Sequence, residues 1–306
     1  MLRNFYELDN SFILNNYEIN EVISTGHNYS VFLVIEKKSK KNFALRILKT
    51  DKTDEKMVYT ILYNIKFNNI SGILRIFHFE RFLSMRPIPK ILTESFENDD
   101  DDFKNPRYFL IIEEYMHGKD IDYLLQQYLR TKGTKNKFMN PTIRNKIIFG
   151  IAATMKSLHK LNLIHGNLNT SHIFLDDNLE PRISYCRLPK TTYDFESNCM
   201  PIQMISGENN SIQSDVYCYS ILLYKLFSKS IKYESSFNGE LLLKRPNNIS
   251  DAFWQLIQLC MNKNLDERPT FAQITEWLKD DKYAIEEYGM KANLDELHEY
   301  QKRIDI

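Results

Sequence analysis

Apolar and polar residues alternate, or gather in short apolar runs, over residues 17–23, 31–35 and 42–48. Turn-forming residues separate these runs, at Gly26-His27-Asn28 and at Lys37-Lys38-Ser39-Lys40. Short runs joined by such turns are typical of neighbouring antiparallel strands. The pattern therefore predicts an antiparallel sheet from Tyr17 onward. Residues 1–16 show no clear periodicity and are expected to form a short N-terminal leader.

Helical spacing, in which apolar residues recur every three or four positions, dominates most of the remaining chain. Within residues 53–67, the apolar side chains would share one buried face; they are Met57, Ile61, Leu62 and Ile65. Two further apolar runs, at 73–77 and 108–112, predict strands that complete the sheet. Further helices are predicted over residues 121–125 and 140–161.

Composition and charge narrow the classes of function. The chain has 306 residues, 43% of them apolar, which is enough for a substantial core in one large domain or two packed lobes. Lys plus Arg and Asp plus Glu number 40 each, so no overall field favours nucleic acid or an anionic membrane surface. No apolar stretch reaches the roughly 18 residues of a membrane span. The sequence predicts neither nucleic-acid binding nor membrane insertion.

Cysteine usage bears on the compartment. The four cysteines form no Cys-x-x-Cys pair; they are Cys186, Cys199, Cys218 and Cys260. Such spacing suits a reducing compartment and disfavours a zinc ribbon or a disulfide framework. The N-terminal residues also lack a basic flank followed by a continuous apolar segment, so no export signal is predicted. The expected location is cytoplasmic or nuclear.

The residues with the most distinctive chemistry follow the helix expected at 140–161. They read Leu163-Ile164-His165-Gly166-Asn167-Leu168-Asn169-Thr170-Ser171-His172, then Ile173-Phe174-Leu175-Asp176. This stretch resembles the catalytic loop of the eukaryotic protein kinase family, His-Arg-Asp-Leu-Lys-Pro-Glu-Asn, which precedes an apolar strand. The resemblance implies that Asn167 replaces the catalytic-base aspartate and Asn169 its neighbouring lysine, while His172 replaces the magnesium-binding asparagine.

A second magnesium ligand of the family also has no counterpart. Tyr185-Cys186-Arg187 stands where the family has Asp-Phe-Gly, so Tyr185 replaces the metal-binding aspartate. Shifting the frame does not restore it, because no Asp or Glu lies between Pro181 and Tyr193. The resemblance therefore implies that His172 and Tyr185 are degenerate metal positions and that Mg²⁺ does not bind.

The predicted strands carry further matches with substitutions. Residues 24–31 stand at the glycine-rich loop that covers the ATP phosphates, but only Gly26 of its three glycines is kept and Tyr29 occupies the third glycine position. Phe43-Ala44-Leu45-Arg46 stands for Val-Ala-Ile-Lys, so Arg46 replaces the phosphate-gripping lysine. A planar guanidinium is not interchangeable with a compact ammonium there.

The glutamate that pairs with that lysine in the family falls at Val58, and Glu55 lies about one turn earlier. The activating ion pair of the family is therefore expected to be absent. Residues 113–120 are expected to connect the two lobes, which places Glu113 at the gatekeeper position, where a buried carboxylate needs a partner. Residues 91–94 are the other candidate for this connection, but an acidic run at 98–102 follows them instead of a helix. That run is expected to be a solvated loop, with docking of a basic partner as the alternative.

Landmarks later in the chain agree with the resemblance. Pro201-Ile202-Gln203 falls where the family has Ala-Pro-Glu, and Asp215 leads a helix like the central one of the large lobe. Leu259-Cys260-Met261 and Asp266-Glu267-Arg268-Pro269-Thr270-Phe271 resemble the signature of tyrosine-kinase-like members. Arg268 would ordinarily pair with a glutamate that Gln203 replaces here.

The resemblance implies an α+β, bilobal protein kinase-like fold, with a small antiparallel β-sheet lobe carrying one helix and a larger, mainly helical lobe. The expected domains are a leader at 1–16, a kinase-like domain at 17–278 and a C-terminal tail at 279–306. Within the kinase-like domain, residues 17–116 form the small lobe and 117–278 the large lobe. The implied nucleotide-contacting positions are Gly26, Val31, Ala44, Arg46, Glu114, Met116 and Phe174.

The leading functional hypothesis is a pseudokinase, a catalytically impaired kinase-like domain that acts in signalling as a scaffold or allosteric partner of other signalling proteins, an active kinase among them. No cofactor is expected beyond very weak binding of ATP, because Phe174 would fill the adenine groove by packing against Val31 and Ala44. The alternative is a divergent active Ser/Thr or Tyr kinase, in which Arg46 grips phosphate and His172, Asp176 or Asp177 recruits metal. A third reading keeps nucleotide binding without transfer.

Overall fold

The computed structural model describes residues 11–26, 28–82, 106–130, 137, 140–185, 211–228, 234–235, 241–287 and 289–305. These residues form two compact units. Those of the first unit lie within Met1–Asn69 and Leu74–Met116, and those of the second within Ile70–Ile73, His117–Arg187 and Phe195–Ile306. The expectations for residues 91–94, 98–102, 186–187 and 201–203 lie outside the described residues.

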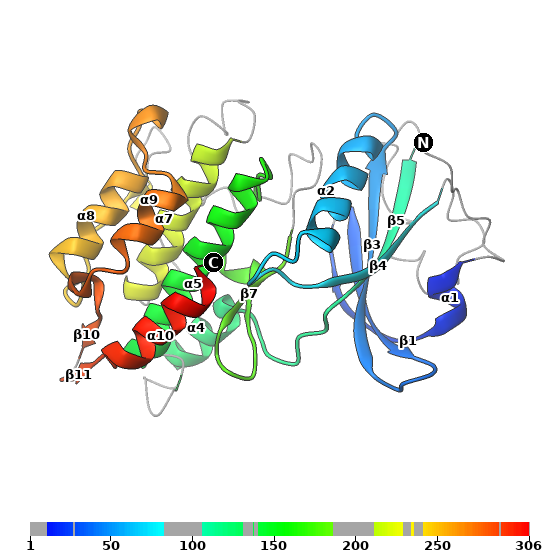
Figure 1. The fold of residues 1–306 in the computed structure, drawn as a ribbon, viewed down its shortest axis with the longest axis horizontal. Helices are drawn as coiled ribbons and strands as arrows, with labels where there is room; N and C mark the ends of the chain where they lie inside the picture. The colour runs from blue at the N-terminus through cyan, green and yellow to red at the C-terminus, as the bar shows by residue number, and fades with distance from the viewer. Residues whose placement is uncertain are drawn as a thin grey trace. The chain divides into compact units, whose positions relative to one another are not determined.

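The first unit is built on a five-stranded antiparallel sheet of order β1-β2-β3-β5-β4 (Figure 1). Its strands are β1 (Tyr17–Thr25), β2 (Tyr29–Glu36), β3 (Asn42–Asp51), β4 (Ile76–Phe82) and β5 (Pro106–Glu113). The strand predicted at 73–77 starts later than expected. Ile73 forms only an isolated bridge to Ile183, and the carbonyl of Gly72 accepts the Ile183 N–H at 2.7 Å, so this backbone is bonded within the second unit.

Helices α1 (Phe12–Asn16) and α2 (Glu55–Phe67) lie on opposite sides of this sheet (Figure 1). Ile13 of α1 packs on the face formed by Phe32, Leu45 and Ile47. The buried carboxylate of Glu80 in β4 accepts hydrogen bonds from the Ser11 hydroxyl and the Phe12 N–H, at 2.6 and 2.7 Å. The end of the segment expected to be a leader is therefore tied to the sheet.

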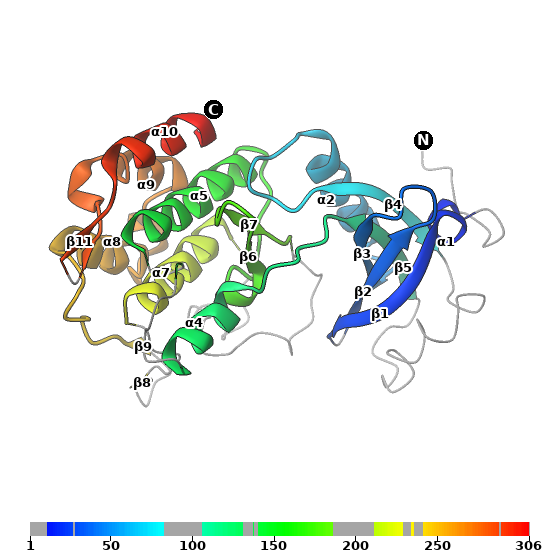
Figure 2. The same ribbon diagram turned by 90° about the horizontal axis from the view of Figure 1, so that it is seen from below.

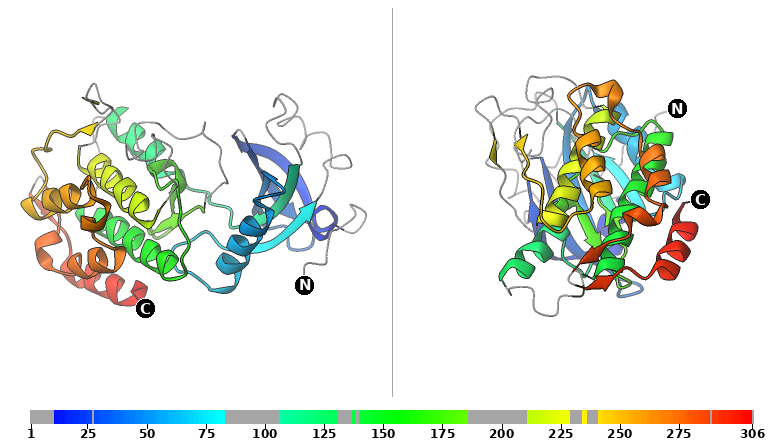
Figure 3. Two further views of the ribbon diagram at one scale, coloured as in Figure 1. Left: turned by 90° about the horizontal axis from the view of Figure 1, so that it is seen from above. Right: turned by 90° about the vertical axis from the view of Figure 1, so that its left-hand side faces the viewer.

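The second unit is mainly helical (Figures 2 and 3). Its helices are α4 (Ile121–Arg130), α5 (Pro141–Lys160), α7 (Ile212–Ser228), α8 (Asp251–Cys260), α9 (Phe271–Trp277) and α10 (Leu294–Ile304), with 3-10 turns at Thr170–His172, Leu265–Glu267 and Asp281–Tyr283. Short hairpins pair β6 (Ile173–Leu175) with β7 (Pro181–Ile183), β8 (Glu234–Ser235) with β9 (Leu241–Leu242), and β10 (Glu286–Glu287) with β11 (Met290–Lys291).

Helices α5 and α7 form the centre of this unit because they are buried on nearly every side. Asn140 caps α5, accepting the Thr142 N–H at 2.9 Å, and Pro141 occupies the first turn, where its missing N–H costs nothing. The buried Tyr219 of α7 donates its hydroxyl to the Ile148 carbonyl at 2.9 Å. This pair of helices supports the loop that follows α5.

The residues after 278 pack on α5 instead of extending from the unit (Figure 2). Arg144 of α5 is completely buried and pairs with Glu287. The Asn145 side chain donates to the Tyr283 carbonyl at 2.7 Å and accepts the Ile285 N–H at 2.8 Å.

Within the described residues, no helix is both long and apolar enough to cross a membrane. The predicted fold class, an antiparallel sheet unit with a helix and a larger helical unit, is confirmed, and α1 is an addition to it.

Candidate functional site

The loop from Leu163 to His172 is held by a carboxylate from α7. Asp215 is completely buried, and its two oxygens accept the backbone N–H groups of His165 at 2.9 Å and Gly166 at 2.8 Å. The same carboxylate contacts Nε2 of His159 at 2.9 Å, at the end of α5. Gly166 adopts a φ angle of +75°, a backbone conformation that residues other than glycine rarely adopt. Asp215 and Gly166 together set the path of the loop.

His165 serves as an internal brace of the loop. Its ring is completely buried, Nε2 donates to the Ser184 carbonyl at 2.9 Å, and Nδ1 accepts the Asn167 N–H at 3.3 Å. Burial lowers the pKa of His165 to about 4, although the Asp215 carboxylate opposes this shift. Both ring nitrogens of the neutral His165 therefore form hydrogen bonds inside the protein. These bonds join the loop to the end of β7.

Both polar atoms of the Asn167 side chain are used inside the protein. Its Oδ1 accepts from Asn169 Nδ2 at 2.9 Å, and its Nδ2 lies 3.1 Å from His172 Nε2. Oδ1 of Asn169 in turn accepts the N–H and the hydroxyl of Ser171, at 2.9 and 2.6 Å. The ring of His172 reaches the Ser184 hydroxyl through Nδ1 at 3.3 Å. These residues form one network of two carboxamides, two hydroxyls and an imidazole.

The direction of every bond in this network follows from one backbone group. The Ser171 N–H can only donate, so the atom of Asn169 that receives it is the oxygen. Asn169 Nδ2 must then donate to Asn167, which fixes Asn167 Nδ2 as the donor to His172. The Nε2 atom of His172 is therefore an acceptor, and its proton lies on Nδ1 toward Ser184. This arrangement requires a neutral His172.

The other positions of the second unit that the sequence analysis singled out are also engaged. The Tyr185 hydroxyl donates to the Ile164 carbonyl at 2.8 Å, and its ring lies edge-on to His165 at 5.8 Å. Asp176 caps a turn, because its Oδ1 accepts the N–H groups of Asn178 and Glu180 at 2.9 and 3.0 Å. Phe174 is half-buried, in β6.

In the first unit, Arg46, to which only the alternative of an active kinase assigned phosphate binding, is paired with Glu113, the residue expected at the gatekeeper position. Arg46 Nε and Nη2 both lie 2.9 Å from Glu113 Oε1, and the two side chains are only 11% and 8% exposed. The antiparallel register sets this meeting, because Ala44 is paired with Glu113 and Arg46 lies two residues along β3, on the same face. Sequence reasoning missed the pair, although a buried glutamate that needed a cation was its signal.

Tyr29 completes this cluster. Arg46 lies over the Tyr29 ring, 5.6 Å from its centroid. A Cβ atom added to Gly26 would lie 2.3 Å from the same ring, so Tyr29 occupies the space beside the glycine at the tip of the hairpin. Val31 is paired with Arg46 and shares that face of the sheet. Gly26, Tyr29, Val31, Ala44, Arg46 and Glu113 are thus gathered on one side of the first unit.

Val58 and Glu55, the α2 residues at and one turn before the position expected for the family's glutamate, have other roles. Val58 is buried in the inner face of α2. Glu55 pairs with Arg81 at 2.6 Å and with Arg107 at 3.3 Å. Glu114, beyond β5, accepts the Arg75 N–H at 3.3 Å, and its own N–H donates to the Arg75 carbonyl at 2.9 Å.

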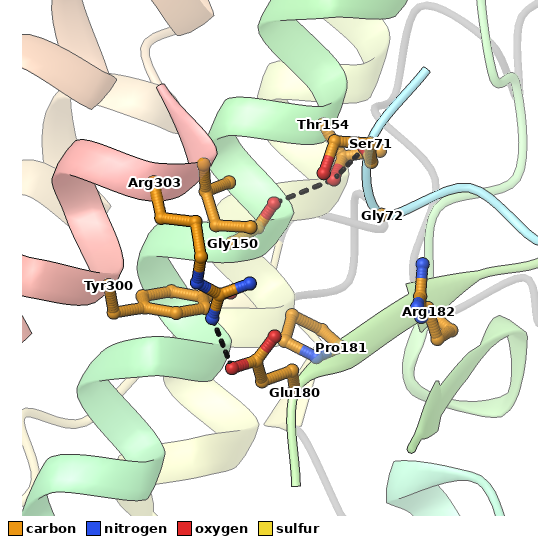
Figure 4. A pocket seen from close by; sticks show the side chains of 10 residues that line it. Ser71, Gly72, Gly150, Thr154, Glu180, Pro181, Arg182, Tyr300 and Arg303 are labelled. Carbon is orange, nitrogen blue, oxygen red and sulfur yellow. Dashed lines mark hydrogen bonds and ion pairs between the residues drawn. The ribbon is translucent and has the colours of Figure 1, made fainter. Parts of the chain in front are cut away.

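A cavity of about 50 Å³ lies in the second unit, where Gly150, Pro181 and the last turn of α10 meet (Figure 4). Figure 4 shows the Tyr300 ring beside Gly150 and the Glu180–Arg303 ion pair across from Thr154. Ligand pockets for small molecules measure roughly 300–1,000 Å³, so this cavity is too small for a nucleotide. Among the described residues, no three His, Cys, Asp or Glu side chains gather as a metal site.

Comparison with known proteins extends this geometry. The family model of protein tyrosine and serine/threonine kinases matches residues 103–278, more than half of the chain. A probable serine/threonine-protein kinase of Dictyostelium discoideum is 26% identical over 221 residues, covering 55% of this chain and 28% of the relative. The dual specificity protein kinase splA of the same organism is 26% identical over 208 residues, covering 56% of this chain and 8% of the relative. The chain thus spans less than a third of the length of either relative.

Proposed function

Because the chain belongs to the family of protein tyrosine and serine/threonine kinases, we propose that it is a pseudokinase, which binds other signalling proteins without transferring phosphate. The observation that carries the proposal is the closed network at the position of the catalytic base. Asn167 replaces the aspartate there, and both polar atoms of its side chain are bonded to Asn169 and His172. We assign the chain to the tyrosine-kinase-like branch from the signature around Arg268.

An amide at this position cannot do the work of a base. A carboxylate accepts the proton of a substrate hydroxyl, whereas a carboxamide is not protonated near neutral pH. A positioned general base contributes roughly 10²–10⁴ in rate. The neighbouring lysine of the family, which Asn169 replaces, would also have supplied positive charge near the transferred phosphoryl group. Because such groups act as a unit, their losses are not summed.

The residues at the metal positions do not fit Mg²⁺. This ion prefers oxygen ligands, above all carboxylates and phosphates, in octahedral geometry. One position offers His172, whose Nε2 already accepts from Asn167, and the other offers Tyr185, whose hydroxyl donates to the Ile164 carbonyl.

Nucleotide binding is proposed to be very weak as well. Glu113 holds the guanidinium of Arg46, and the Tyr29 ring lies against both Arg46 and Gly26. To grip a phosphate, Arg46 would have to leave a buried carboxylate, which would then be left without its partner. This competition argues against the alternative of a divergent active kinase in which Arg46 binds the phosphates.

The test is phosphate transfer by purified protein free of other kinases. Wild type is incubated with radiolabelled ATP and Mg²⁺ or Mn²⁺, alone and with generic protein substrates, beside Asn167→Ala and Asn167→Asp. We expect no incorporation above the Asn167→Ala background and no recovery in Asn167→Asp. Incorporation by wild type that Asn167→Ala abolishes would refute the proposal and establish the divergent kinase.

Thermal shift measurements across ATP concentrations examine nucleotide binding separately. A ligand stabilises the folded state in proportion to its occupancy, so very weak binding predicts an unchanged unfolding temperature. A rise of several degrees at sub-millimolar ATP, without transfer, would instead identify a nucleotide-binding pseudokinase.

A further inference from the structure

The outer face of α2 carries a continuous row of aromatic rings, two of which are exposed. Tyr59, Tyr63 and Phe67 follow one another at four-residue spacing, with ring centroids 6.5 Å apart for the first pair and 4.6 Å for the second. Phe79 of β4 extends the row, 5.5 Å from Tyr59 and edge-on to it. We call these four residues the α2 aromatic stripe. Tyr63 is 49% exposed and Phe67 is 60% exposed.

Tyr63 and Phe67, the exposed part of the stripe, do not belong to the apolar face that buries α2 in the first unit. The inner face of α2 already buries its own apolar residues, which are Val58, Ile61, Leu62 and Ile65. Tyr and Phe are also poorer helix formers than Ala, Leu or Lys, which would serve on a solvated face. Single exposed apolar residues are ordinary, but contiguous exposed rings mark surfaces that bind other proteins.

Two lysines of α2 flank the stripe. Lys66 lies 5.4 Å from the Phe67 ring and 5.7 Å from the Phe79 ring, and Lys56 is exposed at the other end of the helix. Among the described residues, neither lysine forms an ion pair with a carboxylate. Glu55 is the single acidic residue of α2, and two arginines already neutralise it. Burial lowers the pKa of Lys66, and a nearby carboxylate would oppose this shift.

We infer that the α2 aromatic stripe is a docking surface for an acidic, amphipathic segment of a partner protein. Lys56 and Lys66 are ten residues apart, which corresponds to about 15 Å along a helix. A complementary segment would place apolar side chains over the rings and carboxylates at both ends, about three helical turns apart. A second copy of this chain fits less well, because antiparallel α2 helices would bring Lys56 of one copy to Lys66 of the other.

The inference deepens the proposed function by stating the chemistry of the partner. Its test is binding, whereas the proposed function is tested by phosphate transfer, so the two fail independently. The probe is a set of fluorescein-labelled, 18-residue helical peptides with Leu and Phe on one face and Glu at both ends. Matched peptides carry Lys in place of each Glu. Fluorescence anisotropy measures the affinity of each peptide for the full chain.

The variants separate the stripe from exposed rings in general. Phe67→Ala and Tyr63→Ala shorten the stripe, and Tyr123→Ala is the control, because Tyr123 of α4 is 41% exposed with Lys119 beside its ring but belongs to no such row. We expect a loss of affinity for the Glu peptides of at least tenfold in the stripe variants and none in the control. All variants should keep the unfolding temperature of wild type within a few degrees, because the replaced rings are half exposed.

Charge reversal supplies the second arm of the test. The double variant Lys56→Glu/Lys66→Glu should exchange the preference, binding the Lys peptides more tightly than the Glu peptides. The inference is overturned if wild type binds both peptide sets equally, or if Phe67→Ala binds like wild type. It is also overturned if wild type sediments as a dimer that Phe67→Ala dissociates, since the stripe would then be an interface between copies.

Discussion

Removing the carboxylate of Glu113 should selectively destabilise the sheet of the first unit. Arg46 and Glu113 are joined by two contacts of 2.9 Å, and their side chains are 11% and 8% exposed. Breaking one partner of such a buried pair typically costs about 3–5 kcal/mol. The Tyr29 ring would still face the cation, and this contact contributes about 0.5–2 kcal/mol. We therefore expect Glu113→Ala to cost about 3 kcal/mol.

The assay must report on the first unit alone, because the chain has two compact units. Native-state hydrogen exchange of the β3 and β5 amides does this, since exchange from their opened state follows the local free energy. A cost of about 3 kcal/mol corresponds to exchange roughly a hundredfold faster, at 1.4 kcal/mol for each factor of ten. The matched control is Glu114→Ala, which removes only a 3.3 Å bond from the Arg75 N–H and should change exchange less than tenfold.

A double variant examines the cause. In Arg46→Met/Glu113→Leu both charges are absent, so exchange should return toward the wild-type rate, because apolar replacement of a whole buried pair is often neutral. The reasoning fails if Glu113→Ala exchanges like Glu114→Ala. It also fails if the double variant is as unstable as the single one, because the loss would then come from packing and not from an unpaired charge.

Three further predictions concern the second unit. Gly150→Ala should destabilise this unit because the added Cβ would lie 2.2 Å from the Tyr300 hydroxyl oxygen, although Ala ordinarily favours a helix by about 0.5–1 kcal/mol over Gly. Chemical denaturation should show partial recovery of stability in Gly150→Ala/Tyr300→Phe, and a stabilised Gly150→Ala would contradict the packing. Because burial lowers the pKa of His165 to about 4, the unfolded state takes up a proton first as pH falls below 6.5, and this group should lower the free energy of unfolding by about 2 kcal/mol between pH 7 and pH 5. The drop measured for His165→Gln should be smaller by that amount, and a drop equal to that of wild type would refute the lowered pKa of His165. Glu287→Ala removes the carboxylate that pairs with the fully buried Arg144 of α5 and should lower the free energy of unfolding by about 3–5 kcal/mol. Glu296→Ala removes a carboxylate that is 51% exposed and should lower it by less than about 1 kcal/mol; similar losses in the two variants would count against a buried pair.

The sequence by itself determined the order and type of the main elements. Strands expected at 17–23, 31–35 and 42–48 became β1, β2 and β3, and the helix expected at 140–161 became α5. Periodicity carries this information because a strand must alternate between two faces and a helix must repeat every three to four residues to bury an apolar side. The identities of Asn167 and Tyr185 could likewise be read directly, because neither side chain carries a carboxylate in any conformation.

The tertiary structure alone decided which groups these residues meet. The sequence indicated that a buried Glu113 would need a partner but did not identify Arg46, since that pairing depends on the register of β3 against β5. It also left open the alternative that His172 recruits a metal, and it did not identify Asn167 as the donor to Nε2 of His172, a hydrogen bond whose direction the Ser171 N–H fixes. Such partners are set by long-range register and by the directionality of hydrogen bonds, which the spacing of residues along the chain does not record.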